Sequence, residues 1–425
     1  MINITQIENE LYTAAHANHS IHLIKAIIDK GEHGLGLAPF EAAILLKNND
    51  AAVTAEIFRA ANALKEKIYG KRVVLFAPLY ISDYCMNECS YCGYRCSNTA
   101  SRCKLSQDEI VNEVRALEKM GHKRLALELG EDSEQAPLEY VLDSIKTIYA
   151  TTTNNGIIRR VNVNIAATSI NNYRKLKDAN IGTYILFQET YHPEAYAYYH
   201  TSGPKADYSY HLAAMDRAMQ AGLGDIGIGA LFGLYDPDFE ALALLYHAAH
   251  LENTYGIGPH TVSVPRLKPA DGTTPPMFDV GDEHFAKIVA VLRLALPYTG
   301  LILSTREPAA LRKQLLNVGI SQISAGSQAA VGGYTNTSAV EQFSVSDIRS
   351  LDETVGWLCR EGFIPSFCTE CYSDGRVGDV FMALAKSGEI NNYCTPNAMK
   401  TLQEYSENFA TDTTKSAIME LRRTL

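Results

Sequence analysis

The spacing of hydrophobic residues changes near residue 70. Before it, apolar residues recur at three- and four-residue intervals over 40–46 and 52–64, which predicts amphipathic helices. After it, short β-rich runs begin near Val73, Arg124, Arg160, Gly182, Asp225, His260, Gly300 and Ile320. Stretches with helical periodicity separate most of these runs, at 107–120, 138–149, 207–221, 238–250, 281–294 and 308–318.

Alternation of strands and helices predicts an α/β fold with a parallel sheet. Eight repeats between residues 71 and 340 fit a closed (β/α)₈ barrel, for which ~250 residues is typical. An open doubly wound sheet is the alternative, but no Gly-x-Gly-x-x-Gly follows the first strand. We therefore predict three regions: an N-terminal helical segment (1–70), the barrel (71–340) and a C-terminal extension (341–425).

Composition narrows the range of functions. The net charge of −10 argues against nucleic acid as a partner, because phosphate binding needs clustered lysine and arginine. No stretch approaches the ~20 apolar residues of a membrane helix, so we expect no membrane partner. The chain opens without a secretory signal, which predicts a cytoplasmic protein. Nine cysteines in such a chain indicate metal or redox chemistry rather than a disulfide scaffold.

Three cysteines, Cys85, Cys89 and Cys92, follow the first predicted strand directly. Three thiolates can hold three irons of a 4Fe-4S cube and leave the fourth iron open to another ligand. The alternatives are a zinc site, with Cys96 as the fourth ligand, or simple burial. Catalytic groups of a barrel lie at the C-terminal ends of its strands, which is where this trio falls.

A second set, Cys368, Cys371 and Cys394, lies in the C-terminal extension. A Cys-x-x-Cys pair alone fits zinc or a redox dithiol. Three cysteines with no evident fourth predict a second cluster with an exchangeable iron.

Polar residues also end several other predicted strands. They are Gly130, Glu131 and Asp132 after the second, Asn164 after the third, Gln188 and Glu189 after the fourth, Arg306 after the seventh, and Ser324 and Ser327 after the eighth. A glycine lets the backbone approach a ligand closely, and an acidic side chain beside it can accept a hydrogen bond from an ammonium group. Arg306 can bind a substrate carboxylate in bidentate fashion. From their strand positions, we expect Arg160 and Asn164 to contact a cofactor and Gln188 to contact substrate.

The Cys-x₃-Cys-x₂-Cys spacing, with Tyr91 before the third cysteine, resembles the radical S-adenosylmethionine (radical SAM) enzymes. The resemblance implies that Cys85, Cys89 and Cys92 hold a 4Fe-4S cluster whose open iron binds S-adenosylmethionine. In that family a Gly-Gly-Glu-like element binds the methionine amino group, and Gly130-Glu131-Asp132 stands in its place. Which of the two acidic residues does so stays open, and Tyr91 is expected near the cofactor.

The whole chain resembles a narrower group, the HydG family of radical SAM tyrosine lyases that mature FeFe-hydrogenase. The resemblance rests on the segments 75–82, 258–261, 323–327 and 332–334 and on the C-terminal Cys-x₂-Cys-x₂₂-Cys. The 2-iminoacetate synthase family of thiamine biosynthesis (ThiH) shares the barrel but lacks the C-terminal cysteines. That set is therefore the discriminating feature.

The resemblance to HydG implies cleavage of L-tyrosine to p-cresol and dehydroglycine, and then formation of carbon monoxide and cyanide on iron. Arg306, Ser324 and Ser327 would hold tyrosine. Cys368, Cys371 and Cys394 would hold an auxiliary Fe-S cluster, and His260 its labile iron. The implied partners are free cysteine on that iron, an electron donor such as ferredoxin or flavodoxin, and other hydrogenase maturases.

Several alternatives stay open. A ThiH-like enzyme would stop at dehydroglycine. A related maturase would serve another metallocofactor. A zinc-binding scaffold would have no activity. Separately, the alternative to iron binding by His260 is that it caps the start of a strand.

Overall fold

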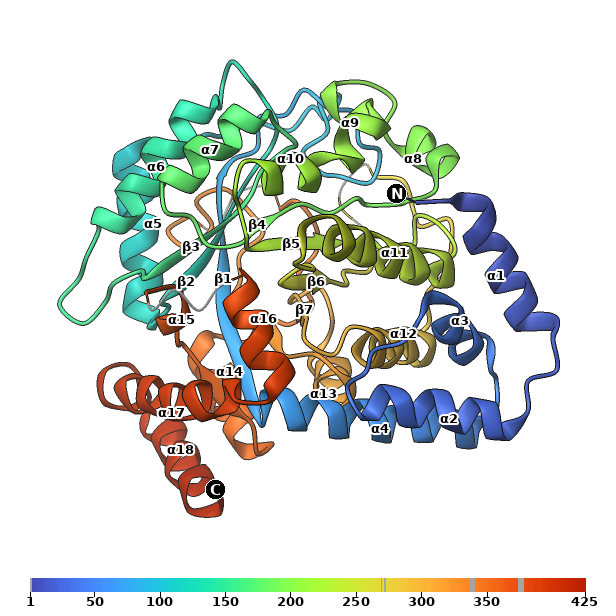
Figure 1. The fold of residues 1–425 in the computed structure, drawn as a ribbon. Coiled ribbons are helices and arrows are strands. Elements are labelled where there is room, and N and C mark those ends of the chain that lie inside the picture. The colour runs from blue at the N-terminus through green and yellow to red at the C-terminus, as the bar shows by residue number, and fades with distance from the viewer. Residues whose placement is uncertain (1, 269, 271–272, 337–340, 374–377) are drawn as a thin grey trace.

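Eight parallel strands close into a barrel (Figure 1) in the computed structural model, which describes residues 2–268, 270, 273–336, 341–373 and 378–425. The strands are β1 (Arg72–Ser82), β2 (Arg124–Leu129), β3 (Arg160–Asn164), β4 (Tyr184–Ile185), β5 (Ile226–Gly229), β6 (Thr261–Ser263), β7 (Gly300–Leu303) and β8 (Gln322–Ser324). They are neighbours in chain order, and β1 pairs with both β2 and β8. The predicted (β/α)₈ barrel is confirmed.

Helices surround the barrel. Those between the strands are α5 (Gln107–Met120), α6 (Leu138–Ala150), α7 (Ile170–Asp178), α8 (Pro193–Tyr199), α9 (Tyr208–Leu212), α10 (Ala214–Gln220), α11 (Pro237–Tyr255), α12 (Asp282–Ala295) and α13 (Ala309–Val318), with a 3₁₀ turn at Pro204–Ala206. Four more precede β1: α1 (Ile4–His16), α2 (Ile21–Glu32), α3 (Pro39–Lys47) and α4 (Ala51–Tyr69). Asn3, Ser20 and Asp50 cap three of these with side-chain oxygens, the residue types that favour helix starts. α4 packs against α12 and α13 on the outside of the barrel.

Strand β1 is unusually long and has three partners. Its first residues, Arg72–Val74, pair with β9 (Ile364–Ser366), which lies on the same edge of β1 as β2. Its middle pairs with β8, and residues from Ala77 onward pair with β2. A register shift between Tyr80 and Ser82 ends the regular pairing just before the cysteine trio.

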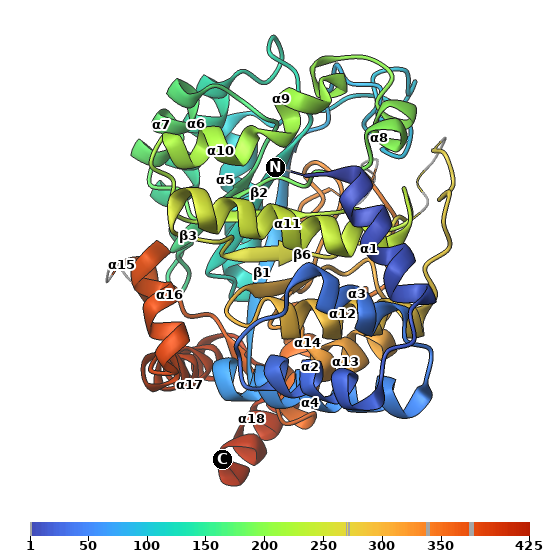
Figure 2. The ribbon, with the colours of Figure 1, turned by 45° about the vertical axis from the view of Figure 1, so that its right-hand side comes forward.

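The C-terminal extension lies around the end of the barrel where β1 begins (Figure 2). It comprises α14 (Leu351–Arg360), β9, α15 (Glu370–Ser373), α16 (Gly378–Ser387), α17 (Ile390–Asn408) and α18 (Asp412–Thr424). The strand β9 and these helices were not predicted individually. None of the helices within the described ranges is long and apolar enough to span a bilayer.

The barrel interior is hollow at three levels along β1. Val73, Leu75, Ala77 and Leu79 are buried against the outer helices, so alternation turns Val74, Phe76, Pro78 and Tyr80 inward. Val74 lines a pocket at the end where β1 begins, Phe76 and Pro78 line one inside the barrel, and Tyr80 lines one at the C-terminal mouth. We call these the lower pocket, the barrel pocket and the mouth pocket.

Candidate functional site

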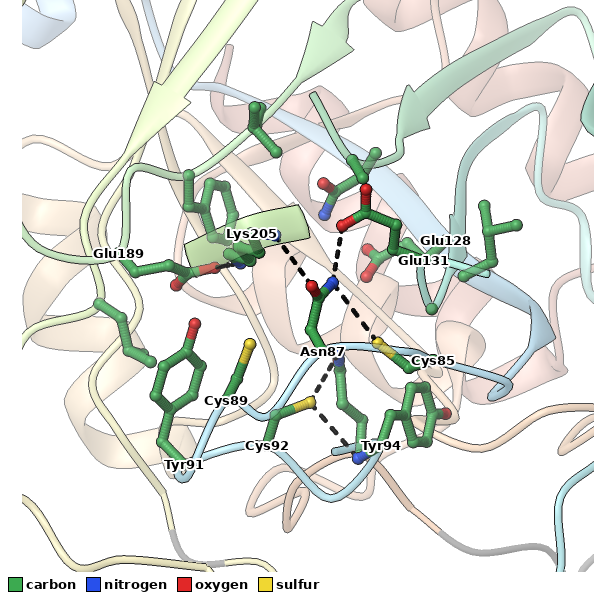
Figure 3. A pocket seen from close by; sticks show the side chains of 18 of the residues that line it. Cys85, Asn87, Cys89, Tyr91, Cys92, Tyr94, Glu128, Glu131, Glu189 and Lys205 are labelled. Carbon is green, nitrogen blue, oxygen red and sulfur yellow. Dashed lines mark hydrogen bonds and ion pairs between the residues drawn. The ribbon is translucent and has the colours of Figure 1, made fainter. Parts of the chain in front are cut away.

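The mouth pocket contains the first cysteine trio (Figure 3). The loop after β1 turns tightly, with the backbone N–H of Cys92 donating to the Cys89 carbonyl at 2.9 Å and that of Tyr94 donating to the Cys92 sulfur at 3.4 Å. All three thiols are free and line the pocket. Burial raises the pKa of Cys89 and of Cys92, a cost that a metal removes by binding the thiolate.

Gly130 lies directly against this loop. A Cβ atom at this position would lie 2.4 Å from the Tyr84 carbonyl oxygen and 3.0 Å from the Cys85 Cβ. Only glycine therefore lets the end of β2 lie beside the cysteines. The sequence argument for Gly130 concerned approach to a ligand, but the closest approach is to the loop that carries Cys85.

Of the two acidic candidates after β2, Glu131 lines the mouth pocket, where its carboxylate accepts from the Asn87 amide at 2.6 Å. Burial raises the pKa of Glu131, and the bond from Asn87 opposes that rise. Asp132 does not line the pocket. Its carboxylate accepts from the backbone N–H groups of Glu134 and Gln135, each at 2.9 Å, so it stabilises the turn that follows.

On the opposite side of the mouth pocket, Lys205 and Glu189 form an ion pair of 2.6 Å (Figure 3). Burial alone would lower the pKa of Lys205, but the charge of Glu189 raises it. Glu189 has a φ of 68°, an uncommon conformation for a residue other than glycine. Tyr91 closes the same side and shares a hydrogen bond of 2.8 Å with His200.

The barrel pocket lies beneath the mouth pocket and shares several lining residues with it, among them Asn164 and Arg306. The guanidinium of Arg306 stacks 3.4 Å from the centre of the Phe343 ring, and burial lowers its pKa. Ser324 lines the barrel pocket with its hydroxyl accepting from the Thr305 N–H at 3.1 Å. Ser327 lines it too, and its buried hydroxyl has no partner among the described groups. The structure thus brings Arg306, Ser324, Ser327 and Asn164 together.

Two predicted site residues lie elsewhere. Arg160 begins β3, and its guanidinium donates to the Ile181 carbonyl at 2.6 Å, so its assignment to the cofactor is corrected. Parallel strands all start at the end of the barrel that is opposite to the mouth, which the prediction overlooked. Gln188 is buried but lines neither the mouth pocket nor the barrel pocket, because Phe187 takes the inward position beside it. Its assignment to substrate is corrected as well.

The lower pocket contains the second cysteine trio. Cys368, Cys371, Cys394 and His260 all line it, although His260 is more than 100 residues away in the sequence. The sulfurs of Cys371 and Cys394 are 4.0 Å apart, and the His260 ring lies 4.6 Å from that of Phe381. Arg72 and Arg124 line the same pocket, and Arg124 donates to the Cys368 carbonyl at 3.0 Å.

Each cysteine trio lines a pocket of its own, one at each end of the barrel. In the part of the chain that the structure describes, no three His, Cys, Asp or Glu side chains form a group that could hold one metal ion. A zinc ion needs all its ligand atoms about 2.0–2.3 Å from one point. In an Fe-S cluster, by contrast, each cysteine binds a different iron. Three thiols around each pocket match the donor set of such a cluster at both ends of the barrel.

Sequence reasoning missed Glu128 and Tyr80, which line the mouth and barrel pockets together. The signal was present in the run Arg124–Leu129, whose leucines alternate with Arg124, Ala126 and Glu128. A charged residue on the face opposite the leucines of a buried strand points into the barrel.

Comparison with known proteins agrees with this geometry. The model of the radical SAM superfamily matches residues 79–246, and that of the biotin and thiamin synthesis associated domain matches 263–364. A crystal structure of HydG, a maturase of the [FeFe]-hydrogenase, is 51% identical with a TM-score of 0.97, covering 100% of this chain and 93% of that one. The HydG structure from Carboxydothermus hydrogenoformans is 42% identical with a TM-score of 0.86, covering 99% and 95%. The 2-iminoacetate synthase of Salmonella typhimurium is 30% identical over 80% of this chain and 89% of its own length.

Proposed function

Because the chain belongs to the HydG family of radical SAM enzymes, we propose that it cleaves L-tyrosine and converts one fragment to carbon monoxide and cyanide on iron. The first step yields p-cresol and dehydroglycine, and the iron-bound product serves assembly of the FeFe-hydrogenase cofactor. The observation that supports this proposal most directly is the presence of two separate three-cysteine pockets, one at each end of the barrel.

The mouth pocket is the proposed radical centre. Cys85, Cys89 and Cys92 would hold a 4Fe-4S cluster with S-adenosylmethionine, which together supply a 5′-deoxyadenosyl radical. Glu131 would accept a hydrogen bond from the amino group of the cofactor, since its carboxylate faces the pocket and is already oriented by the Asn87 amide. Lys205, paired with Glu189, adds a fixed positive charge on the other side.

The barrel pocket is the proposed tyrosine site. Arg306 would bind the substrate carboxylate, because its guanidinium lines the pocket and stacks on Phe343. The free hydroxyl of Ser327 and the oriented hydroxyl of Ser324 would complete the polar contacts. The apolar wall, which includes Phe76, suits an aromatic ring and keeps water from a reactive fragment.

The lower pocket is the proposed site of the auxiliary cluster. Cys368, Cys371 and Cys394 would be its protein ligands, and His260 would bind the labile iron that also takes free cysteine. Val74 in this pocket and Tyr80 in the mouth pocket are six residues apart on β1, which corresponds to roughly 20 Å. We infer that dehydroglycine crosses this distance inside the barrel, since it hydrolyses readily in water.

The test is anaerobic reconstitution with iron and sulfide, followed by incubation with S-adenosylmethionine, dithionite and tyrosine. We would measure p-cresol by chromatography and carbon monoxide by trapping with deoxyhaemoglobin, in the wild type and in the Cys368→Ala/Cys371→Ala variant. The proposal expects both products from the wild type, and p-cresol with little carbon monoxide from the variant. A wild type that makes p-cresol alone would instead be a 2-iminoacetate synthase, as the Salmonella relative is named.

A further inference from the structure

Two opposite charges face the space shared by the mouth and barrel pockets. Arg306 and Glu128 line both pockets, one from the segment after β7 and one from β2. Each lies close enough to the other for its charge to act on the pKa of its neighbour. A shared cavity lined by one guanidinium and one carboxylate is complementary to a zwitterion.

Glu128 differs from the other carboxylates of the mouth pocket. Glu189 is paired with Lys205, and Glu131 accepts from the Asn87 amide. Among the described residues, neither Glu128 nor Arg306 has an ion-pair partner within 4.0 Å. The Tyr80 hydroxyl lies near enough to lower the pKa of the Glu128 carboxyl, while it donates its proton to the Gln342 amide oxygen at 3.0 Å. A buried carboxylate without a cation is costly, so this arrangement favours a cationic ligand.

We propose that Glu128 binds the α-ammonium group of the substrate amino acid and removes a proton from it. This inference rests on the proposed tyrosine lyase function and adds a residue to it. One N–H bond of the ammonium breaks, the proton moves to a carboxylate oxygen of Glu128, and the electron pair stays on nitrogen. The neutral amine that results can lose a hydrogen atom to a radical far more easily than an ammonium group can.

The surroundings of Glu128 suit a proton acceptor near neutral pH. Burial raises the pKa of Glu128 to about 7, while the Tyr80 hydroxyl and the Arg306 charge oppose the rise. The other titratable groups whose charge interacts with Glu128 are the phenols of Tyr94 and Tyr334, which are neutral at this pH. An ammonium group placed against the carboxylate would favour its ionised form before the transfer.

The test compares binding of two ligands to the reconstituted enzyme by anaerobic titration calorimetry. Glu128→Gln should weaken binding of L-tyrosine roughly 10- to 150-fold, the range for a lost hydrogen bond to a charged group. The same variant should bind 3-(4-hydroxyphenyl)propanoate, which lacks the ammonium group, at least as well as the wild type does. The matched control, Arg306→Gln, should weaken both ligands because both carry the carboxylate.

The pH dependence of p-cresol formation gives a second readout. The wild-type kcat/KM, which reports the free enzyme, should fall as the pH drops below about 7, whereas Glu128→Asp should keep an acid limb and Glu128→Gln should lose it. Unchanged tyrosine binding by Glu128→Gln would overturn the proposal, and equal loss of both ligands would mean a structural role only. If the wild type makes no p-cresol, the proposed function fails first, so the two failures are distinguishable.

Discussion

Replacement of Gly130 by alanine tests how the barrel positions the first cysteine trio. The new methyl group would lie 2.4 Å from the Tyr84 carbonyl oxygen, a contact that must open to at least 3.0 Å. The obstructing atom is backbone, so the loop carrying Cys85 has to move by about 0.6 Å. Overpacking of this kind costs about 1–3 kcal/mol of stability. A shift approaching ~1 Å can reduce a rate ~100-fold, so we expect at least a tenfold loss of S-adenosylmethionine cleavage.

The assay is iron content and cofactor cleavage after anaerobic reconstitution, with thermal unfolding as a check on the fold. Gly281→Ala is the matched control, because a Cβ there would meet nothing within 4 Å and the residue has a φ of −61°. We expect the control to keep full activity and to lose about 1 kcal/mol of stability at most. Gly130→Ala that loads iron and cleaves the cofactor as the wild type does would refute the close approach of β2 to the cysteine loop.

Three further outcomes follow from the structure. His260→Ala should still form p-cresol but should deliver little carbon monoxide to iron. The carbon monoxide is measured by haem trapping and infrared spectroscopy, and an unchanged amount would refute the role of His260. Burial lowers the pKa of His122 from 6.5 to about 3, so the unfolded chain binds more protons between these values and stability is lost as the pH falls below 6.5. The free energy of unfolding, measured with urea at pH 7.0 and 5.5, should therefore decrease between these pH values by about 1 kcal/mol more in the wild type than in His122→Leu. Equal decreases in the two proteins would contradict this. Leu244→Ala, on the buried face of α11, should cost about 2–5 kcal/mol in the same assay without altering iron content, whereas a cost below 1 kcal/mol would mean that the site is not packed.

Much of the barrel was predictable because hydrophobic periodicity follows directly from burial. The strand predicted near Val73 is β1, and the helix predicted over 107–120 matches α5. The strand β9 escaped prediction because it has three residues, one of them Pro365, and carries no periodic signal of its own. The helix predicted over 207–221 is divided into α9 and α10.

The candidate site was predictable where the chemistry is local in sequence. Each cysteine trio is visible from spacing, and His260 from its motif. The depth of a side chain in the barrel depends instead on register between strands, which a single sequence does not provide. That is why Arg160 was assigned to the wrong end of the barrel, and why Glu128 was not assigned at all.

The pairing of β1 with β9 has a consequence for biosynthesis. The first residues of the first barrel strand have β8 on one edge, but the other edge is covered only by Ile364–Ser366, almost 300 residues downstream. As the chain leaves the ribosome, this edge stays open until nearly the entire protein has been made, and exposed strand edges recruit other chains. Shortening the protein before β9 would therefore not yield a simpler enzyme with one centre. It would leave an unpaired edge that promotes aggregation, so the last part of the chain to be made completes the fold of the first strand.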